Sequence, residues 1–160
     1  MVTWDEFWTR YVCDFCAVHA TDVGRLLLAG LCGAVVGWER EAHEKAAGLR
    51  THILLAVGAC LFTLVAAKAQ QDDMTRLIQG MVTGTGFLAG GVIFREGLSI
   101  RGLTTAVGLW LMGAIGLAVG MGEHFLGIVA TIFMFITLSV LRHVEQRFAR
   151  RTDKGQSAGT

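Results

Sequence analysis

The feature of this sequence that most restricts its fold is the separation of charged residues from long apolar stretches. Only 17% of its 160 residues are charged and 53% are hydrophobic. The charges collect in short clusters, and the stretches between these clusters carry almost none. A helix needs roughly 20 mainly apolar residues to cross the hydrocarbon core of a bilayer, and several stretches approach that length. We therefore expect an all-α membrane protein.

The apolar stretches define the expected organisation of the chain. They cover about 23–38, 53–69, 77–94, 103–121 and 125–141. This pattern predicts a compact bundle of about five transmembrane helices. The expected domains are an N-terminal interfacial segment (1–21), a five-helix membrane domain (22–142) and a basic cytoplasmic tail (143–160). The interfacial prediction follows from Trp4 and Trp8 beside acidic residues; a partly disordered leader is the alternative. For the tail we expect a helix end followed by a disordered terminus.

The distribution of basic residues predicts the orientation. With five spans, the first and third loops lie on the same side as the C-terminal tail. That side holds ten of the fourteen basic residues: Arg40, Lys45, Arg50, Arg95, Arg101, Arg142, Arg147, Arg150, Arg151 and Lys154. Because short cytoplasmic loops are rich in Lys and Arg, we expect the N-terminus outside and the C-terminus inside.

Glycines four residues apart recur within the apolar stretches. The pairs are Gly33 and Gly37, Gly80 and Gly84, Gly86 and Gly90, and Gly116 and Gly120. Residues four apart share a helix face, and small side chains there let helices approach closely in lipid. Two interpretations are open: packing within one protomer, or a groove for a second copy or another protein.

The densest polar motifs lie where apolar stretches begin or end. Glu39 and Arg40 end the first stretch, and Arg50, Thr51 and His52 begin the second. A carboxylate near a helix C-terminus is disfavoured by the helix dipole, so we expect Glu39 to have a cationic partner, with Arg50 or Arg101 as candidates. Thr51 and His52 lie where free backbone N–H groups form a natural anion site. The alternative is that these charges only anchor helix ends among lipid headgroups.

A further polar motif begins the fourth stretch. It contains Arg101, Thr104 and Thr105. The threonine hydroxyls are suited to capping that helix or to bonding with Glu39 or Arg50. We take these residues and those of the preceding motifs as the candidate cytoplasmic polar cluster: Glu39, Arg40, Arg50, Thr51, His52, Arg101, Thr104 and Thr105.

Four motifs in this order resemble the MgtC/SapB family of bacterial inner-membrane proteins. They are Gly-x-Glu-Arg-Glu at 37–41, Ala-Gly-Leu-Arg-Thr-His at 47–52, the glycine-rich run at 84–93, and Arg-Gly-Leu-Thr-Thr-Ala at 101–106 with a following Trp110. The resemblance implies about five spans in the inner membrane and a link to growth in low magnesium. It also implies action through other membrane proteins, including the F-type ATP synthase. Many members continue into a soluble C-terminal domain, and we expect this chain to be a short form without it.

The expected function is therefore regulation, through membrane contacts, of adaptation to low magnesium or envelope stress, without enzymatic activity. The alternative is a transporter or channel for magnesium or another ion. Its expected partners are the lipid bilayer, another membrane protein and a second copy of itself. We expect no cofactor, no metal and, at a net charge of +1, no nucleic acid.

Two weaker candidates remain on the predicted outer side. Cys13 and Cys16 form a CxxC motif near His19, which suits a disulfide or a metal site, but a single pair lacks the second half of a zinc signature. Asp72 and Asp73 are suited to holding a hydrated magnesium ion loosely, although a solvated turn is the simpler interpretation.

Overall fold

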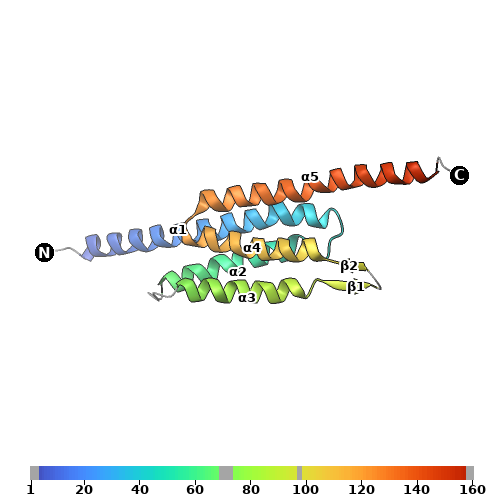
Figure 1. Ribbon diagram of the computed structural model, residues 1–160. Coiled ribbons are helices and arrows are strands. Elements are labelled where there is room, and N and C mark those ends of the chain that lie inside the picture. The colour runs from blue at the N-terminus through green and yellow to red at the C-terminus, as the bar shows by residue number, and fades with distance from the viewer. Residues whose placement is uncertain (1–3, 69–73, 97–98, 158–160) are drawn as a thin grey trace.

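A computed structural model shows five helices bundled side by side, with a short β-hairpin at one end (Figure 1). It describes the backbone of residues 4–68, 74–96 and 99–157, and the side chains of 19–68, 74–95 and 99–142. The elements are α1 (Trp4–Glu41), α2 (Leu49–Lys68), α3 (Met74–Gly90), β1 (Phe94–Glu96), β2 (Ser99–Arg101), α4 (Leu103–Met121) and α5 (His124–Ser157). The first part of α1 and the last part of α5 extend beyond the bundle at opposite ends (Figure 1).

Four of the helices contain a segment long and apolar enough to cross a membrane. These segments are His19–Glu41, Leu49–Lys68, Leu103–Met121 and His124–Arg142. The expected all-α bundle of five helices is thus confirmed, and four of the five contain a candidate membrane span. The third helix, α3, has 17 residues, which is short against the roughly 20 that a spanning helix needs.

Glycines explain where two helices begin or end. The third apolar stretch was expected to reach Phe94, but α3 ends at Gly90, because consecutive glycines favour leaving the helix. Phe94 instead pairs with Arg101 in the antiparallel hairpin. α4 lies between Gly102 and Gly122, with φ of 91° and 94°. This left-handed conformation costs glycine little, and both glycines delimit the predicted fourth stretch.

The last helix is longer than the sequence indicated. For the tail after residue 141 we expected a helix end followed by a disordered terminus, and the α5 backbone continues as a helix to Ser157. α1 likewise begins at Trp4 and runs without a break into its span. Both differences have the same cause: apolar content marks the membrane-crossing part of a helix, and a polar continuation carries no such mark.

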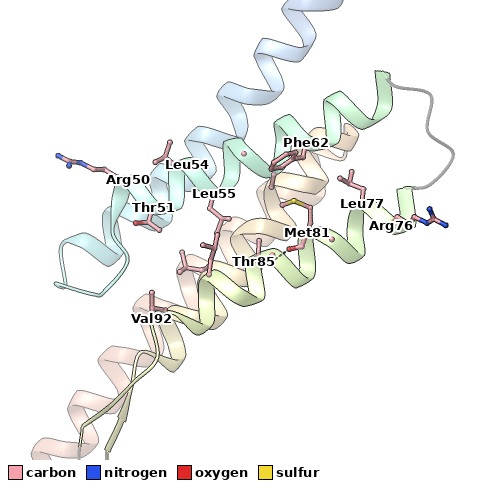
Figure 2. Close-up of a pocket in the computed structure, with 16 residues that line it drawn as sticks. Arg50, Thr51, Leu54, Leu55, Phe62, Arg76, Leu77, Met81, Thr85 and Val92 are labelled. Carbon is pink, nitrogen blue, oxygen red and sulfur yellow. Dashed lines mark hydrogen bonds between the residues drawn. The ribbon is translucent and has the colours of Figure 1, made fainter.

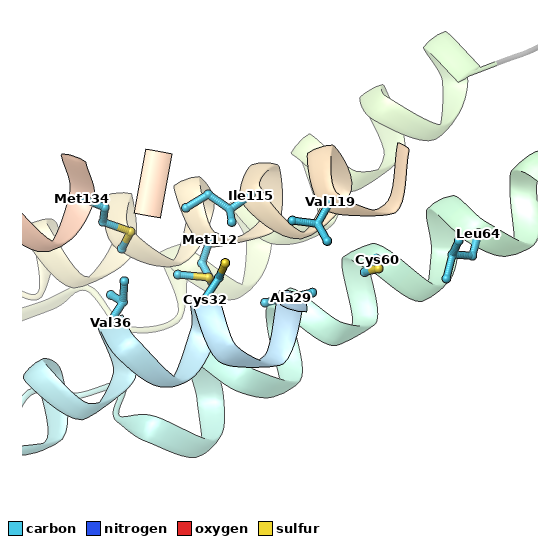
Figure 3. Packing of buried hydrophobic residues seen from close by; sticks show 10 residues of the cluster. Ala29, Cys32, Val36, Cys60, Leu64, Met112, Ile115, Val119 and Met134 are labelled. Atoms are coloured by element: carbon cyan, nitrogen blue, oxygen red, sulfur yellow. The ribbon is translucent and has the colours of Figure 1, made fainter. Parts of the chain in front are cut away.

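α4 is the central helix of the bundle, and it packs against all four others. Its Met112, Ile115 and Val119 are at most 1% exposed. They meet Val36 of α1 and Cys60 of α2 in one apolar cluster (Figure 3). The middle of the bundle is therefore filled by hydrocarbon side chains.

Two of the predicted glycine pairs hold α2 between its neighbours. A Cβ added at Gly33 would lie 2.6 Å from the His52 carbonyl oxygen. A Cβ added at Gly37 would lie 2.7 Å from Leu49 Cα. On the other side, a Cβ at Gly116 would lie 2.3 Å from the Ala56 carbonyl oxygen. Gly120 stands equally close to Cys60 and Thr63. α1 and α4 thus approach the α2 backbone at distances that only glycine allows.

The other two pairs behave differently. Added Cβ atoms at Gly80, Gly84, Gly86 and Gly90 would meet nothing within 4 Å. For these four glycines of α3, packing inside the protomer is therefore the wrong interpretation. The four-residue spacing alone could not separate the glycines packed against α2 from the open glycines of α3. The same spacing arises on a buried helix face and on an exposed one.

Candidate functional site

A buried polar cluster lies at the end of the bundle that carries the hairpin, which we call the hairpin end. Glu39 and Arg40 occupy the last turn of α1 and are only 6% and 5% exposed. Glu39 Oε1 accepts a hydrogen bond of 2.9 Å from Nη1 of Arg142 on α5. Arg40 Nη2 donates to Thr105 Oγ1 on α4 at 2.5 Å. Two adjacent residues of α1 thereby tie it to α5 and to α4.

His52 forms the second part of this cluster. It is fully buried against the glycine face of α1, and its Nδ1 lies 2.9 Å from the carbonyl oxygen of Gly48. Since a carbonyl can only accept, this hydrogen bond requires a proton on Nδ1, and in the neutral form of the ring Nε2 is then an acceptor. Within the described part of the chain, neither His52 Nε2 nor Glu39 Oε2 has a hydrogen-bond partner. The cluster therefore contains two buried hydrogen-bond acceptors, Glu39 Oε2 and His52 Nε2, that a group with an N–H or O–H donor could bind.

The turn between α1 and α2 is held by a carboxylate at the start of α2. Glu41 Oε2 accepts a hydrogen bond of 2.7 Å from the backbone N–H of Leu49. A Cβ at Gly48 would lie 2.6 Å from this same oxygen, so glycine is required for the approach. The anion site predicted at the start of α2 therefore holds an anion from the chain itself.

This capping arrangement gives a testable prediction. Because an N-terminal capping bond is worth about 1 kcal/mol, Glu41→Ala should lower the free energy of unfolding in detergent by about that amount. Gly48→Ala should do the same by displacing the carboxylate. The double variant should lose no more free energy of unfolding than the more destabilised single variant, since both substitutions remove the same hydrogen bond. Fully additive losses would contradict the assignment, and Glu123→Ala at an exposed position is the control.

The structure brings together only part of the predicted cluster. Glu39, Arg40, His52 and Thr105 are buried within it. Arg50, Thr51, Arg101 and Thr104 are exposed. The expected pairing of Glu39 with Arg50 or Arg101 is wrong, because Glu39 pairs with Arg142. The Arg50 side chain extends away from the bundle (Figure 2). The expected capping by threonine is also not found: α4 begins at Gly102 without a side-chain cap.

Sequence reasoning missed Arg142 as the partner of Glu39. The two residues are 103 positions apart, so no local motif joins them. One signal was available, since Arg142 directly follows the fifth apolar stretch on the side that the charge count assigned to Glu39.

A smaller set of charges closes the opposite end of the bundle, which we call the Asp22 end. Asp22 of α1 forms an ion pair of 2.5 Å with Lys68 of α2. Arg25 Nη1 donates a 3.0 Å hydrogen bond to the carbonyl oxygen of Gly120 on α4. The charged groups at the Asp22 end thus link α1 to α2 and α4, whereas those at the hairpin end link α1 to α4 and α5. The Asp72 and Asp73 candidates and the side chains of Cys13 and Cys16 lie outside the described residues.

An open groove runs between α2 and α3 (Figure 2). Its volume is about 850 Å³. The walls are mainly apolar, with Leu54 and Phe62 on α2 and Leu77 on α3, and Arg50 and Arg76 lie at its two ends. The groove exists because α2 and α3 have few direct contacts and the glycines between them leave space.

The comparison with known proteins covers all of the buried cluster. A sequence model of the MgtC family matches residues 26–147. The chain belongs to the MgtC family. This match includes Glu39, Arg40, His52, Thr105 and Arg142, so the cluster belongs to the part of the chain that is shared with relatives.

Three relatives illustrate the extent of the similarity. Protein MgtC of Salmonella typhimurium (strain LT2) is 42% identical over 122 residues, which are 76% of this chain and 53% of that protein. Protein MgtC of Brucella abortus (strain 2308) is 41% identical over 122 residues, covering 74% and 51% of the two chains. An uncharacterised protein of Synechocystis is 40% identical over 119 residues, again covering 74% and 51%. This MgtC-family chain spans about half the length of these curated relatives. No solved structure matches it.

Proposed function

We propose that the chain is a non-enzymatic protein of the bacterial inner membrane that supports adaptation to low magnesium or envelope stress by contacting other membrane proteins. Its place in the MgtC family supports this proposal. The F-type ATP synthase, which the family resemblance implies, is the first partner to test. The N-out, C-in orientation predicted from the basic residues would put the buried cluster on the cytoplasmic side.

The observation that carries the proposal is an unfilled face of α3, which we call the outer stripe. It consists of Gln79, Thr83, Gly86 and Gly90, all exposed. Their spacing of four, three and four places them on one helix face. Small residues let a second helix approach closely in lipid, and an amide or hydroxyl gains by bonding across such a contact. A partner helix packed here would cover Gln79, whose amide is costly to leave without partners in hydrocarbon.

The interior supports contact rather than conduction. In the described part of the chain, charged side chains lie toward the ends of the spans, and many of them are tied to the chain's own atoms. The middle is filled by Met112, Ile115 and their apolar neighbours. A transport site usually places polar or ionisable groups near the bilayer midplane, and among the residues whose side chains are described the apolar core provides no such path through one protomer.

Crosslinking in native membranes tests the contact directly. A photoreactive residue at Thr83, in the outer stripe, should yield a discrete adduct whose second component is a membrane protein. The same residue at Ile132, an exposed position of α5, is the control and should give mainly lipid adducts. Equal protein adducts at both positions would contradict a specific outer-stripe contact.

Growth in limiting magnesium provides a second prediction. Gly86→Leu should reduce the ability of the chain to support such growth by at least about tenfold, because the new side chain blocks close approach of a partner helix. Its free space should keep the fold intact, which a thermal unfolding scan would check. Val129→Leu, at an exposed position of α5, should leave growth unchanged. Magnesium flux into liposomes that scales with the amount of purified protein would favour the transporter alternative instead.

A further inference from the structure

The groove between α2 and α3 has the chemical pattern of an amphiphile-binding site. At the hairpin end it is bordered by Arg50 and Thr51, which offer a guanidinium group and a hydroxyl. Deeper in, its walls are leucine and phenylalanine side chains and three glycines, Gly58, Gly80 and Gly84. A cation followed by an open hydrocarbon channel matches a molecule with a phosphate at one end and acyl chains behind it.

The length of the groove distinguishes between possible occupants. Its α2 wall runs from Arg50 to Phe62, thirteen residues, which places the first and last about 18 Å apart at 1.5 Å per residue. The hydrocarbon core of a bilayer is about 30 Å thick. A spanning helix would therefore extend well past the lined part, whereas a lipid belongs to one leaflet of about half that thickness. The volume of about 850 Å³ lies within the roughly 300–1,000 Å³ of pockets that hold small ligands.

The charges at the hairpin end favour an anionic headgroup. The exposed Arg50 borders the groove at this end. Arginine binds phosphate oxygens through paired N–H donors. A zwitterionic headgroup would bring an ammonium group close to the same arginine and lose part of this attraction.

We propose that the α2–α3 groove binds one anionic phospholipid, with its phosphate at Arg50 and Thr51 and an acyl chain along Gly58, Gly80 and Gly84. This site is separate from the outer stripe, because Gly80 and Gly84 face the groove while Gly86 and Gly90 do not line it. The proposal therefore stands independently of the partner contact proposed above.

Native mass spectrometry of the full chain purified in detergent tests the proposal. The probes are phosphatidylglycerol, phosphatidylethanolamine and diacylglycerol with identical acyl chains, and inorganic phosphate. The wild-type protein should retain one phosphatidylglycerol in preference to the other three. Arg50→Gln should weaken phosphatidylglycerol binding by about tenfold, to the level of phosphatidylethanolamine, since it removes a charge-assisted bond.

Glycine substitutions separate the groove from the surrounding lipid surface. Gly84→Leu fills the groove and should reduce phosphatidylglycerol retention at least tenfold, whereas Gly86→Leu on the same helix should not change it. Neither position has an atom within 4 Å of an added Cβ. Gly58→Leu fills the groove from the α2 side, where space is equally open, and should repeat the loss if Gly84→Leu folds poorly.

Three results would overturn the proposal. The first is equal retention by the Gly84→Leu and Gly86→Leu variants, which would indicate ordinary surrounding lipid. The second is equal binding of diacylglycerol or of inorganic phosphate, which would remove the need for an intact anionic phospholipid. The third is a lipid-free dimer in the mass spectrum of the wild-type protein that is absent from the spectrum of the Gly84→Leu variant. This result would assign the groove to a second copy of the chain.

Discussion

Gly116→Ala should destabilise the bundle by about 3 kcal/mol, the largest loss that we expect from adding one methyl group. The new Cβ would lie 2.3 Å from the Ala56 carbonyl oxygen and 2.9 Å from Ala59 Cβ. Both atoms belong to α2, one of them to its backbone, so no side-chain rotation can relieve the overlap. Overpacking typically costs about 1–3 kcal/mol, and a collision with backbone belongs at the upper end. Thermal or denaturant unfolding of the purified protein in detergent measures the loss.

The matched control for this experiment is Gly84→Ala. It is also a helical glycine with a partner four residues away, but an added Cβ meets nothing within 4 Å. Because alanine is the better helix former by up to about 1 kcal/mol, this variant should be as stable as the wild type or slightly more stable. A loss at residue 84 equal to that at residue 116 would show that helix geometry, rather than contact with α2, sets the glycine requirement.

Glu39→Ala is the second substitution with a large expected effect. It removes the acceptor of Arg142 at the hairpin end and leaves that guanidinium 19% exposed without its carboxylate. Breaking a buried ion pair by removing one partner costs about 3–5 kcal/mol. Since Arg142 is partly exposed, we expect about 3 kcal/mol, measured by unfolding in detergent. α5 should also separate from α1, which a distance measurement between spin labels on the two helices would detect.

The double variant Glu39→Gln with Arg142→Met distinguishes the pair from its separate charges. Replacing both members of a buried pair by uncharged side chains of similar size is often nearly neutral. The double variant should therefore be more stable than either single variant. If the two single variants and the double variant all lost the same free energy of unfolding, the stabilisation would come from packing rather than from the ion pair.

The same substitution separates structure from function. Glu39→Ala should abolish support of growth in low magnesium if the bundle must stay closed. The double variant should restore growth if the pair is only structural. Continued loss of growth in a stable double variant would assign the carboxylate a direct role, which its buried acceptor Oε2 makes chemically reasonable.

The sequence predicted those parts of the fold that depend on local composition. The fourth stretch coincides with α4 because Gly102 and Gly122 delimit it. Charges were expected at the ends of the spans, and Asp22, Lys68, Glu39 and Arg142 lie at or near the ends of the candidate spans because an ion in hydrocarbon is costly. The hairpin was missed because strands of three residues are too short for an alternating pattern to be recognised.

The candidate site was only half predictable for a different reason. The structure buries Glu39, Arg40, His52 and Thr105 at the hairpin end, and in the sequence all four lie at boundaries on one predicted side. Which residues at these boundaries are buried depends on rotation about each helix axis. Arg50 and His52 are two residues apart, and therefore lie on different faces of α2. The choice of Arg142 as partner depends on the placement of α5, which no local pattern determines.

The glycine contacts on both sides of α2 restrict how this protein can move. α2 cannot turn about its own axis or slide between α1 and α4 without forcing backbone atoms on two sides into each other at once. These three helices should therefore behave as one rigid body during any functional cycle. α3 packs mainly on one side, against α4, so any signal that passes through the protein as motion should be carried by displacement of this short helix.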